Sequence, residues 1–144
     1  MYSNEKEEFY KSKLRWKLQR SGLSFYESLL FDNFDDLIRS YLLEYTTFNA
    51  SPVITFWSSK ELWTFISGLE VVSMHHGEVH RIFLDDIKKK IKVPPLVKQG
   101  QESKMDFNCV ALGDVGVKIW APEGKEIFTL MNILQMFPLC NGKD

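Results

Sequence analysis

The three histidines of the chain lie within six residues, in the segment HHGEVH that ends at His80. Histidine is a common metal ligand and can act as a general base near neutral pH. On a helix, His76 and His80 would lie one turn apart and could share a metal ion. Gly77 interrupts such a helix, however, and the residue order differs from the H-E-x-x-H pattern of zinc proteases. We therefore predict polar surface here, with no metal and no cofactor.

Other catalytic chemistry has no recognisable pattern in the sequence. No motif places a serine, cysteine or carboxylate beside the histidines as a nucleophile–base pair requires. The glycines are scattered, without the spacing of a P-loop or of a dinucleotide-binding loop. Cys109 and Cys140 fit neither a C-x-x-C redox pair nor a zinc framework. The sequence predicts that the chain is not an enzyme, and it indicates no small-molecule substrate.

Length and composition indicate one ordinary domain. The 144 residues are 44% apolar, which is enough to bury a core without disulfides or metals. A net charge of -1 excludes an overall polycationic protein. The N-terminal segment lacks the apolar core of a signal peptide, and no apolar run reaches the length of a membrane span. We expect a single domain over residues 1–144 that is intracellular, in the cytoplasm or the nucleus, without membrane contact.

Charge is unevenly distributed along the chain. Residues 1–20 carry six basic and three acidic side chains, residues 21–50 one and five, and residues 81–104 seven and three. Separated basic and acidic faces orient protein partners as often as they bind polyanions. A protein partner is therefore our first expectation, and a nucleic acid is the second.

The apolar pattern predicts helices in the first third of the chain. Over residues 4–20, Tyr10, Leu14 and Leu18 recur at i, i+4 and i+8 and form a stripe that would face a core. Ser24 begins a capping box for a short helix, and a stronger apolar pattern predicts a longer helix over residues 34–45.

The middle of the chain is predicted to alternate between strands and helices. VITFW at 53–57 is β-branched and aromatic and predicts a strand. Ser58 and Glu61 have capping-box spacing and predict a helix that continues to Leu69, and a second helix is predicted over residues 79–92. The remainder is predicted as a loop at 93–104, two strands within 105–120, a third strand at 125–130 and a short helix at 131–137.

The fold class predicted from these elements is α+β, with helices packed on a small antiparallel sheet. From residue 34 to about residue 120 the order is helix, strand, helix, helix, strand, turn, strand. This resembles the order of a winged helix, in which a β-hairpin flanks the second of two packed helices. An α+β domain of another topology fits equally well. Residues 1–31 would be an N-terminal helical extension, and residues 34–137 the α+β body.

The predicted helix over residues 79–92 is the first candidate binding surface. It would place Arg81, Lys88 and Lys92 together on its outer side, where a recognition helix meets bases or phosphates. Asp85 would lie one turn from Arg81 and offset part of this positive charge. For this segment we therefore favour a merely solvated helix face over nucleic-acid contact.

The first helix is the second candidate surface. Lys6, Lys13, Lys17 and Arg20 fall on one side of it, and Phe9 and Trp16 lie beside them. An aromatic ring among cations can stack on single-stranded bases or pack into a protein partner. Alternatively, a second layer of core could cover Trp16. The same choice between core and interface stays open for Trp57 and Trp120.

The function predicted from these features is that of a non-catalytic interaction module, a subunit or domain of a multiprotein assembly. The alternative is a nucleic-acid-binding, winged-helix-like domain. The two hypotheses differ in salt dependence. Binding through phosphates releases counterions from the nucleic acid, so its affinity falls steeply as the salt concentration rises.

Overall fold

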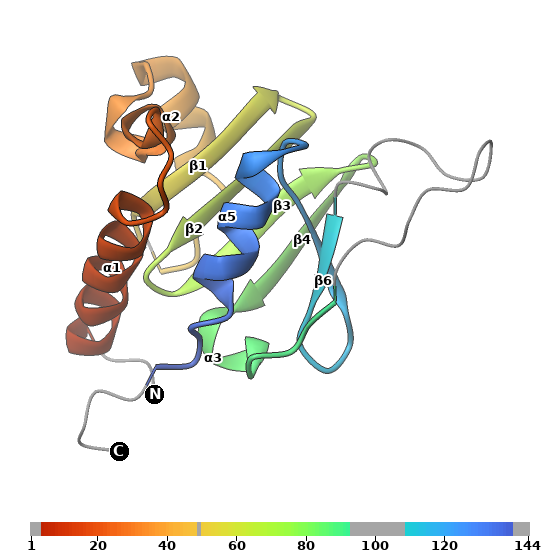
Figure 1. Cartoon of the computed structure of the whole chain (residues 1–144). Helices are drawn as coiled ribbons and strands as arrows, with labels where there is room; N and C mark the ends of the chain where they lie inside the picture. Colours follow the sequence, from red (N-terminus) through yellow and green to blue (C-terminus); the bar gives the residue numbers. More distant parts are fainter. Residues whose placement is uncertain (1–3, 49, 93–108, 140–144) are drawn as a thin grey trace.

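The computed structural model describes residues 4–48, 50–92 and 109–139. Helices and two antiparallel sheets form an α+β fold (Figure 1). In chain order the elements are α1 (Asn4–Gln19), the 3-10 helices η1 (Tyr26–Leu29) and η2 (Phe31–Asn33), α2 (Asp36–Leu43), β1 (Pro52–Ser59), β2 (Leu62–Ser67), β3 (Glu70–His75), β4 (Glu78–Phe83), α3 (Leu84–Ile87), β5 (Ile91–Lys92), β6 (Cys109–Leu112), β7 (Val117–Trp120) and α5 (Lys125–Leu134). The predicted loop at 93–104 and the start of the predicted strand at 105–108 lie outside the described residues.

The larger sheet is a meander of four strands in the order β1-β2-β3-β4. Two residues connect each strand to the next. In the last connection, His76 and Gly77 have φ values of 54° and 75°. A tight type I′ hairpin turn needs positive φ at both central residues. This turn sets the register in which His75 lies opposite Glu78.

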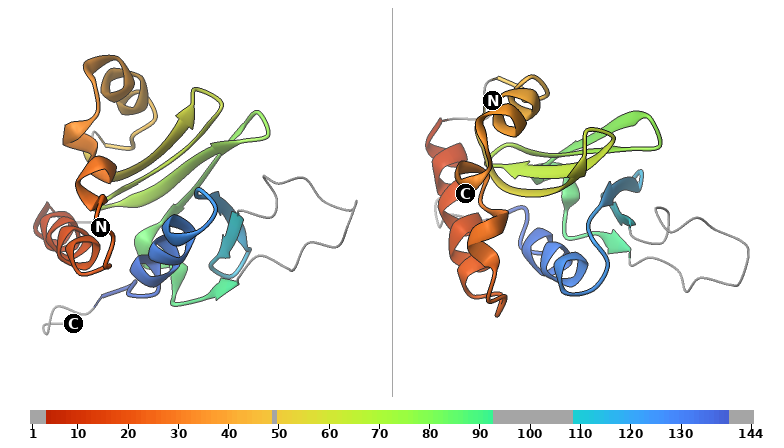
Figure 2. Two further views of the ribbon diagram at one scale, coloured as in Figure 1. Left: turned by 45° about the horizontal axis from the view of Figure 1, so that its top comes forward. Right: turned by 90° about the horizontal axis from the view of Figure 1, so that it is seen from above.

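Both faces of the larger sheet are buried, each under different helices. One face, with Ile54, Ile66 and Val71, packs in a core cluster with residues of α1, α5 and the smaller sheet. The other face packs in a second cluster with residues of η2 and α2, and its fully buried Trp63 and Phe65 rings are stacked 5.7 Å apart. Figure 2 shows α2 and α5 on opposite sides of the sheet.

The first helix packs on this body through the predicted stripe, which is confirmed: Tyr10, Leu14 and Leu18 are fully buried. Its close approach depends on Gly68 in the turn between β2 and β3. A Cβ atom at this position would lie 2.3 Å from the backbone oxygen of Glu7. Because glycine has no Cβ, the helix can lie directly against the turn.

Two predicted helices in the middle of the chain are wrong. Residues 58–69 end β1 and form β2, and residues 79–92 contain most of β4, the single turn α3 and the short β5. Nearly every residue of β2 is buried because helices cover both faces of its sheet. Such a strand has a continuous apolar sequence that also contains helical spacings. From α2 onward the described order is one helix followed by four strands, so it differs from the predicted winged-helix-like order.

The C-terminal part combines confirmed and wrong predictions. β6 and β7 pair antiparallel, as predicted for the two strands within residues 105–120. The predicted third strand at 125–130 is wrong, because these residues begin α5. The predicted helix at 131–137 is the second half of α5, which ends at Leu134. Helical spacing lets Ile127, Leu130 and Ile133 all face the core.

The second helix is shorter than predicted and less buried. It spans Asp36–Leu43, and Asp35 caps its N-terminus by accepting a 2.9 Å hydrogen bond from the Ile38 amide. Leu42 is buried, whereas Leu37 is 83% exposed. The predicted short helix before it is η1, a 3-10 turn in which Ser24 is not the cap residue.

Candidate interaction surface on the first helix

Trp16 is an exposed aromatic residue held between two cations. Its side chain is on the outer side of α1, and the residue is 45% exposed. The Lys13 ammonium lies 5.4 Å from the centroid of the indole ring, and the Arg20 guanidinium carbon lies 5.0 Å from it. Lys13 is also 5.6 Å from the Phe9 ring. Cation–π contacts at exposed sites contribute about 0.5–1 kcal/mol each, so they hold the indole in place without burying it.

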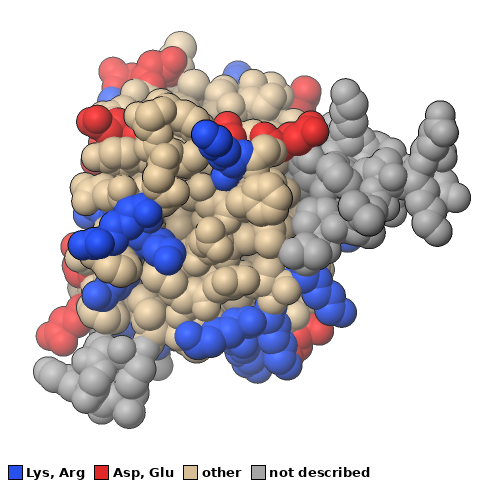
Figure 3. All heavy atoms as spheres, in the orientation of Figure 1, with Lys and Arg blue, Asp and Glu red and all other residues tan. Residues whose placement is uncertain are grey.

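Of the residues predicted to share one surface, Lys13, Trp16 and Lys17 lie on α1, and Arg20 directly follows its last residue. The buried stripe faces the sheet and therefore turns these residues outward, since positions three and four apart share a helix face. Figure 3 shows Lys and Arg gathered over α1, with Asp and Glu above them over the α2 region. We name the outward side of α1, with Phe9, Lys13, Trp16, Lys17 and Arg20, the α1 face.

The predicted helix that would present Arg81, Lys88 and Lys92 on one side is wrong, because these residues lie on separate elements. Arg81 is on β4, Lys88 follows α3 and Lys92 is on β5. Of these, Lys92 is exposed and ends its strand.

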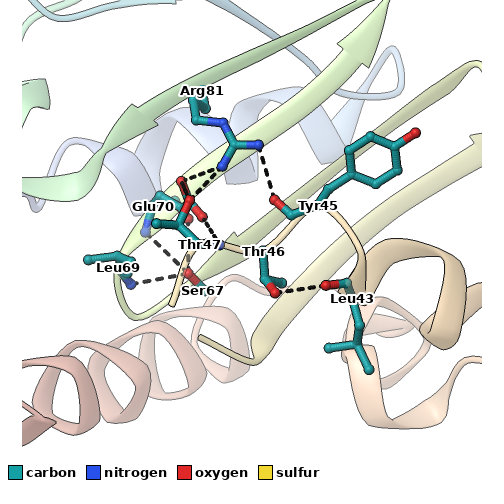
Figure 4. Close-up of polar contacts among 8 residues, drawn as sticks. All are labelled: Leu43, Tyr45, Thr46, Thr47, Ser67, Leu69, Glu70 and Arg81. Carbon is teal, nitrogen blue, oxygen red and sulfur yellow. Dashed lines mark hydrogen bonds and ion pairs between the residues drawn. The ribbon is translucent and has the colours of Figure 1, made fainter. Parts of the chain in front are cut away.

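Arg81 holds the loop between α2 and β1 against the sheet (Figure 4). It donates hydrogen bonds to a Glu70 carboxylate oxygen at 3.0 Å, to the Thr47 hydroxyl at 2.6 Å and to the Tyr45 carbonyl at 3.1 Å. Glu70 is only 1% exposed and also accepts from the Thr47 amide at 2.9 Å. A buried carboxylate needs such partners to offset its desolvation. Arg81 is therefore engaged in internal structure.

Lys88 and Lys90 both bind Asp114, in the turn between β6 and β7. The Lys88 ammonium lies 3.0 Å from one carboxylate oxygen, and Lys90 contacts the other. Hydrogen bonds from Lys90 and Lys88 lower the pKa of Asp114 to about 2, and the same carboxylate raises the pKa of Lys88. These charges therefore neutralise one another in part. Lys89 and Lys90, with Lys92, also line a hollow of about 530 Å³ beside this turn.

Asp85 contacts the first helix, contrary to the predicted pairing with Arg81. Lys6 forms an ion pair with one of its oxygens, and the buried Tyr10 hydroxyl donates a hydrogen bond to the other. The Tyr10 hydroxyl also accepts a 3.1 Å hydrogen bond from the Leu139 amide. Lys6 therefore belongs to the junction of α1, α3 and the C-terminal segment, and not to the α1 face.

The histidines meet at the hairpin between β3 and β4. His75 is buried and its ring stacks on that of His80, with centroids 4.0 Å apart. Its Nε2 atom lies 3.0 Å from the Lys118 carbonyl, to which it donates, and its Nδ1 atom lies 3.1 Å from Nδ1 of His76. In the part of the chain that the structure describes, no group of three His, Cys, Asp or Glu side chains is arranged to hold a metal ion. The cluster connects the two sheets through Lys118.

Some residues with clear structural roles were missed at the sequence level. Glu70 carried a signal, because a single acid within the apolar run Leu69–Val72 is unusual in a core strand and calls for a buried partner. No sequence signal indicated the role of Asp114, because Lys88 and Lys90, which bind it, are about 25 positions away in sequence.

Comparison with protein-family models, curated proteins and solved structures finds no match to the chain. Among the described residues, no helix has the length and apolar character needed to cross a membrane. Function must therefore be inferred from the geometry of the chain's own residues.

Proposed function

We propose that this chain is a non-catalytic interaction module, a subunit or domain of a multiprotein assembly, and that it binds its partner through the α1 face. The observation that carries the proposal is Trp16. A large aromatic side chain, 45% exposed and fixed by Lys13 and Arg20, has little conformational freedom left to lose on binding.

The composition of the α1 face supports a protein partner. Tryptophan and arginine are the residues most enriched among those that dominate binding energy at protein interfaces. The surrounding cations favour a partner with acidic groups at the rim of the contact, where charge speeds and orients association. The opposite side of the helix is fully buried, so the face has a rigid support.

The hypothesis that the module is non-catalytic is supported by how its charged groups are engaged. Three acids bind cations of the chain itself. Glu70 binds Arg81 and Asp85 binds Lys6. Asp114 binds both Lys88 and Lys90. A general acid or base would instead be expected to direct its carboxyl group toward a substrate, without a cation of the chain bound to it.

Nucleic-acid binding is the second candidate, and the α1 face is the observation that favours it. Trp16 between two cations is also suited to stacking on a base of a single strand. Arg81 and Lys88 give this candidate less support, since both form internal ion pairs.

Site-specific photo-cross-linking tests the proposal. A photoreactive phenylalanine analogue replaces Trp16, and in a matched control it replaces Phe128, an aromatic residue on α5 that is 63% exposed. We expect adducts with a saturable protein partner from position 16 only. Excess wild-type chain should compete these adducts away, whereas excess Trp16→Ala chain should not.

The same experiment separates the two candidates. Adducts that disappear after nuclease treatment and weaken steeply with salt would favour nucleic acid over protein. Equal adducts from positions 16 and 128, or adducts that the Trp16→Ala chain also competes away, would reject the α1 face as the binding surface.

A further inference from the structure

The residues on the outward side of α1 complement the same residues read in the opposite direction, with an acid opposite a base and one aromatic residue opposite another. Glu5, Phe9, Ser12, Trp16 and Arg20 follow one another at intervals of four, three, four and four residues, so they form a single stripe. Glu5, Ser12, Trp16 and Arg20 are exposed, and Phe9 is half-buried because its ring also packs against the core. It begins with an acid, ends with a base, and carries aromatic rings at equal distances from its centre.

An antiparallel copy of the helix would therefore meet matching residues. With the two-fold axis between positions 12 and 13, Glu5 lies opposite Arg20 of the second copy and Phe9 lies opposite Trp16. Each of these contacts occurs twice because the axis repeats it. Glu8, which is exposed, lies on the flank of the stripe and would approach the exposed Arg15 of the second copy.

We propose that α1 pairs with α1 of a second copy of this chain, antiparallel and in the register that places Glu5 against Arg20 and Phe9 against Trp16. The inference rests on the proposed function of the α1 face and names a second copy as its occupant. Two acid–base pairs flank two aromatic pairs, an arrangement in which charge sets orientation and register while the rings supply most of the buried apolar area.

The surroundings of α1 allow such a contact. The helix lies at the edge of the molecule in both views of Figure 2, with the sheets on one side of it only. On the other flank, Lys17 would approach Lys6 of the second copy, and Asp85 offsets the charge of Lys6. Lys13 would meet its own copy close to the axis, and it already lies over the Phe9 and Trp16 rings. That position keeps its charge beside aromatic faces and away from the axis. A helix of 16 residues buries little area, so we expect a weak dimer.

Charge exchange tests the register. Sedimentation velocity is measured for the wild-type chain, for Glu5→Arg, for Arg20→Glu and for the double variant Glu5→Arg/Arg20→Glu. Each single variant opposes like charges twice and should raise the dimer Kd about tenfold or more. The double variant restores both pairs and should return the Kd to within about threefold of wild type. Lys125→Glu, an exposed charge reversal on α5, should leave the Kd unchanged.

Recovery in the double variant would be specific to the proposed pairing. Both substitutions oppose the helix dipole, so together they destabilise α1 more than either does alone. Far-ultraviolet circular dichroism monitors that effect. Restored dimerisation in spite of a weaker helix therefore cannot arise from helix stability.

Cysteine cross-linking gives an independent measurement of the register. In a chain with Cys140 replaced by serine, Ser12→Cys places two thiols beside the axis, whereas Ser28→Cys places them on η1 as an exposed control. A short bifunctional thiol reagent should link Ser12→Cys chains into covalent dimers and leave Ser28→Cys chains monomeric.

The outcomes separate this inference from the proposed function. A chain that stays monomeric at concentrations near 1 mM, or a double variant that associates no better than the single ones, overturns the antiparallel α1 pair. If adducts to other proteins still form at position 16, the proposed function stands without the dimer. If dimers form but Trp16→Ala does not weaken them and Ser12→Cys chains are not cross-linked, the antiparallel α1 pair is rejected.

Discussion

Replacing Arg81 by methionine should destabilise the fold without weakening partner binding. The side chain donates three hydrogen bonds, one of them to the 1%-exposed Glu70. Removing one partner of a buried ion pair costs about 3–5 kcal/mol. The Arg81 side chain is itself 40% exposed, and Glu70 keeps its bonds from Thr47, so water can replace part of what is lost. We therefore expect a loss of about 2–3 kcal/mol.

Urea unfolding at neutral pH measures this loss, with Arg15→Met as a matched control on the exposed side of α1. The control should change the free energy of unfolding by less than about 0.5 kcal/mol. A loss of 2–3 kcal/mol corresponds to a melting temperature about 4–10 °C lower in a chain of this size. If Arg81→Met is no less stable than Arg15→Met, Arg81 does not hold the loop against the sheet and its role must be reassigned.

The remaining predictions concern the supports of α1 and a surface ion cluster. Gly68→Ala should lower stability by about 1–3 kcal/mol, because its Cβ would overlap the Glu7 carbonyl, and chemical unfolding measures this loss. Tyr10→Phe should cost about 1–3 kcal/mol, because the Leu139 amide and Asp85 both lose a partner, and it should increase amide exchange in α1. Asp114 has a pKa lowered to about 2 by two lysines, so its stabilisation is present above about pH 4 and is lost as pH falls toward 2. Asp114→Asn should remove that part of the acid dependence of the melting temperature, and an unchanged acid profile would contradict the assignment.

Sequence patterns predicted α1 and β1 correctly. The stripe Tyr10, Leu14 and Leu18 was predicted and is buried, because α1 presents one face to the core and the other to solvent. The strand at 53–57 was predicted from its β-branched and aromatic residues and is part of β1. In both segments local preference and tertiary environment agree, which is the condition for prediction from one sequence.

The pattern was misleading in β2, which is covered on both sides. Leu62, Phe65, Ile66 and Leu69 have helical spacing only because five of the eight residues at 62–69 are apolar. The β-branched residues in that segment favour a strand and were outweighed. At 79–92, the informative signal was Gly77, since a two-residue turn ending in glycine between apolar runs is typical of a hairpin.

The candidate site could be predicted only in part. The spacing of Lys13, Trp16 and Arg20 places them on one side of α1, as predicted. Whether another element covers Trp16 depends on contacts distant in sequence, which helix periodicity does not report. Arg81 was predicted to be a binding residue because its main partner, Glu70, lies on the neighbouring strand of a hairpin that was predicted as a helix.

The affinity of the cross-linked partner for chains altered at Trp16 tests the central claim most directly. With the partner purified, its Kd is measured for the wild-type chain, for Trp16→Ala and for Phe128→Ala, which removes an aromatic ring of greater exposure from α5. We predict that Trp16→Ala raises the Kd about 30-fold or more, as loss of a central interface tryptophan does, and that Phe128→Ala changes it by less than about twofold. Equal effects of the two substitutions, or no effect of Trp16→Ala, would contradict the claim that the α1 face is the binding surface.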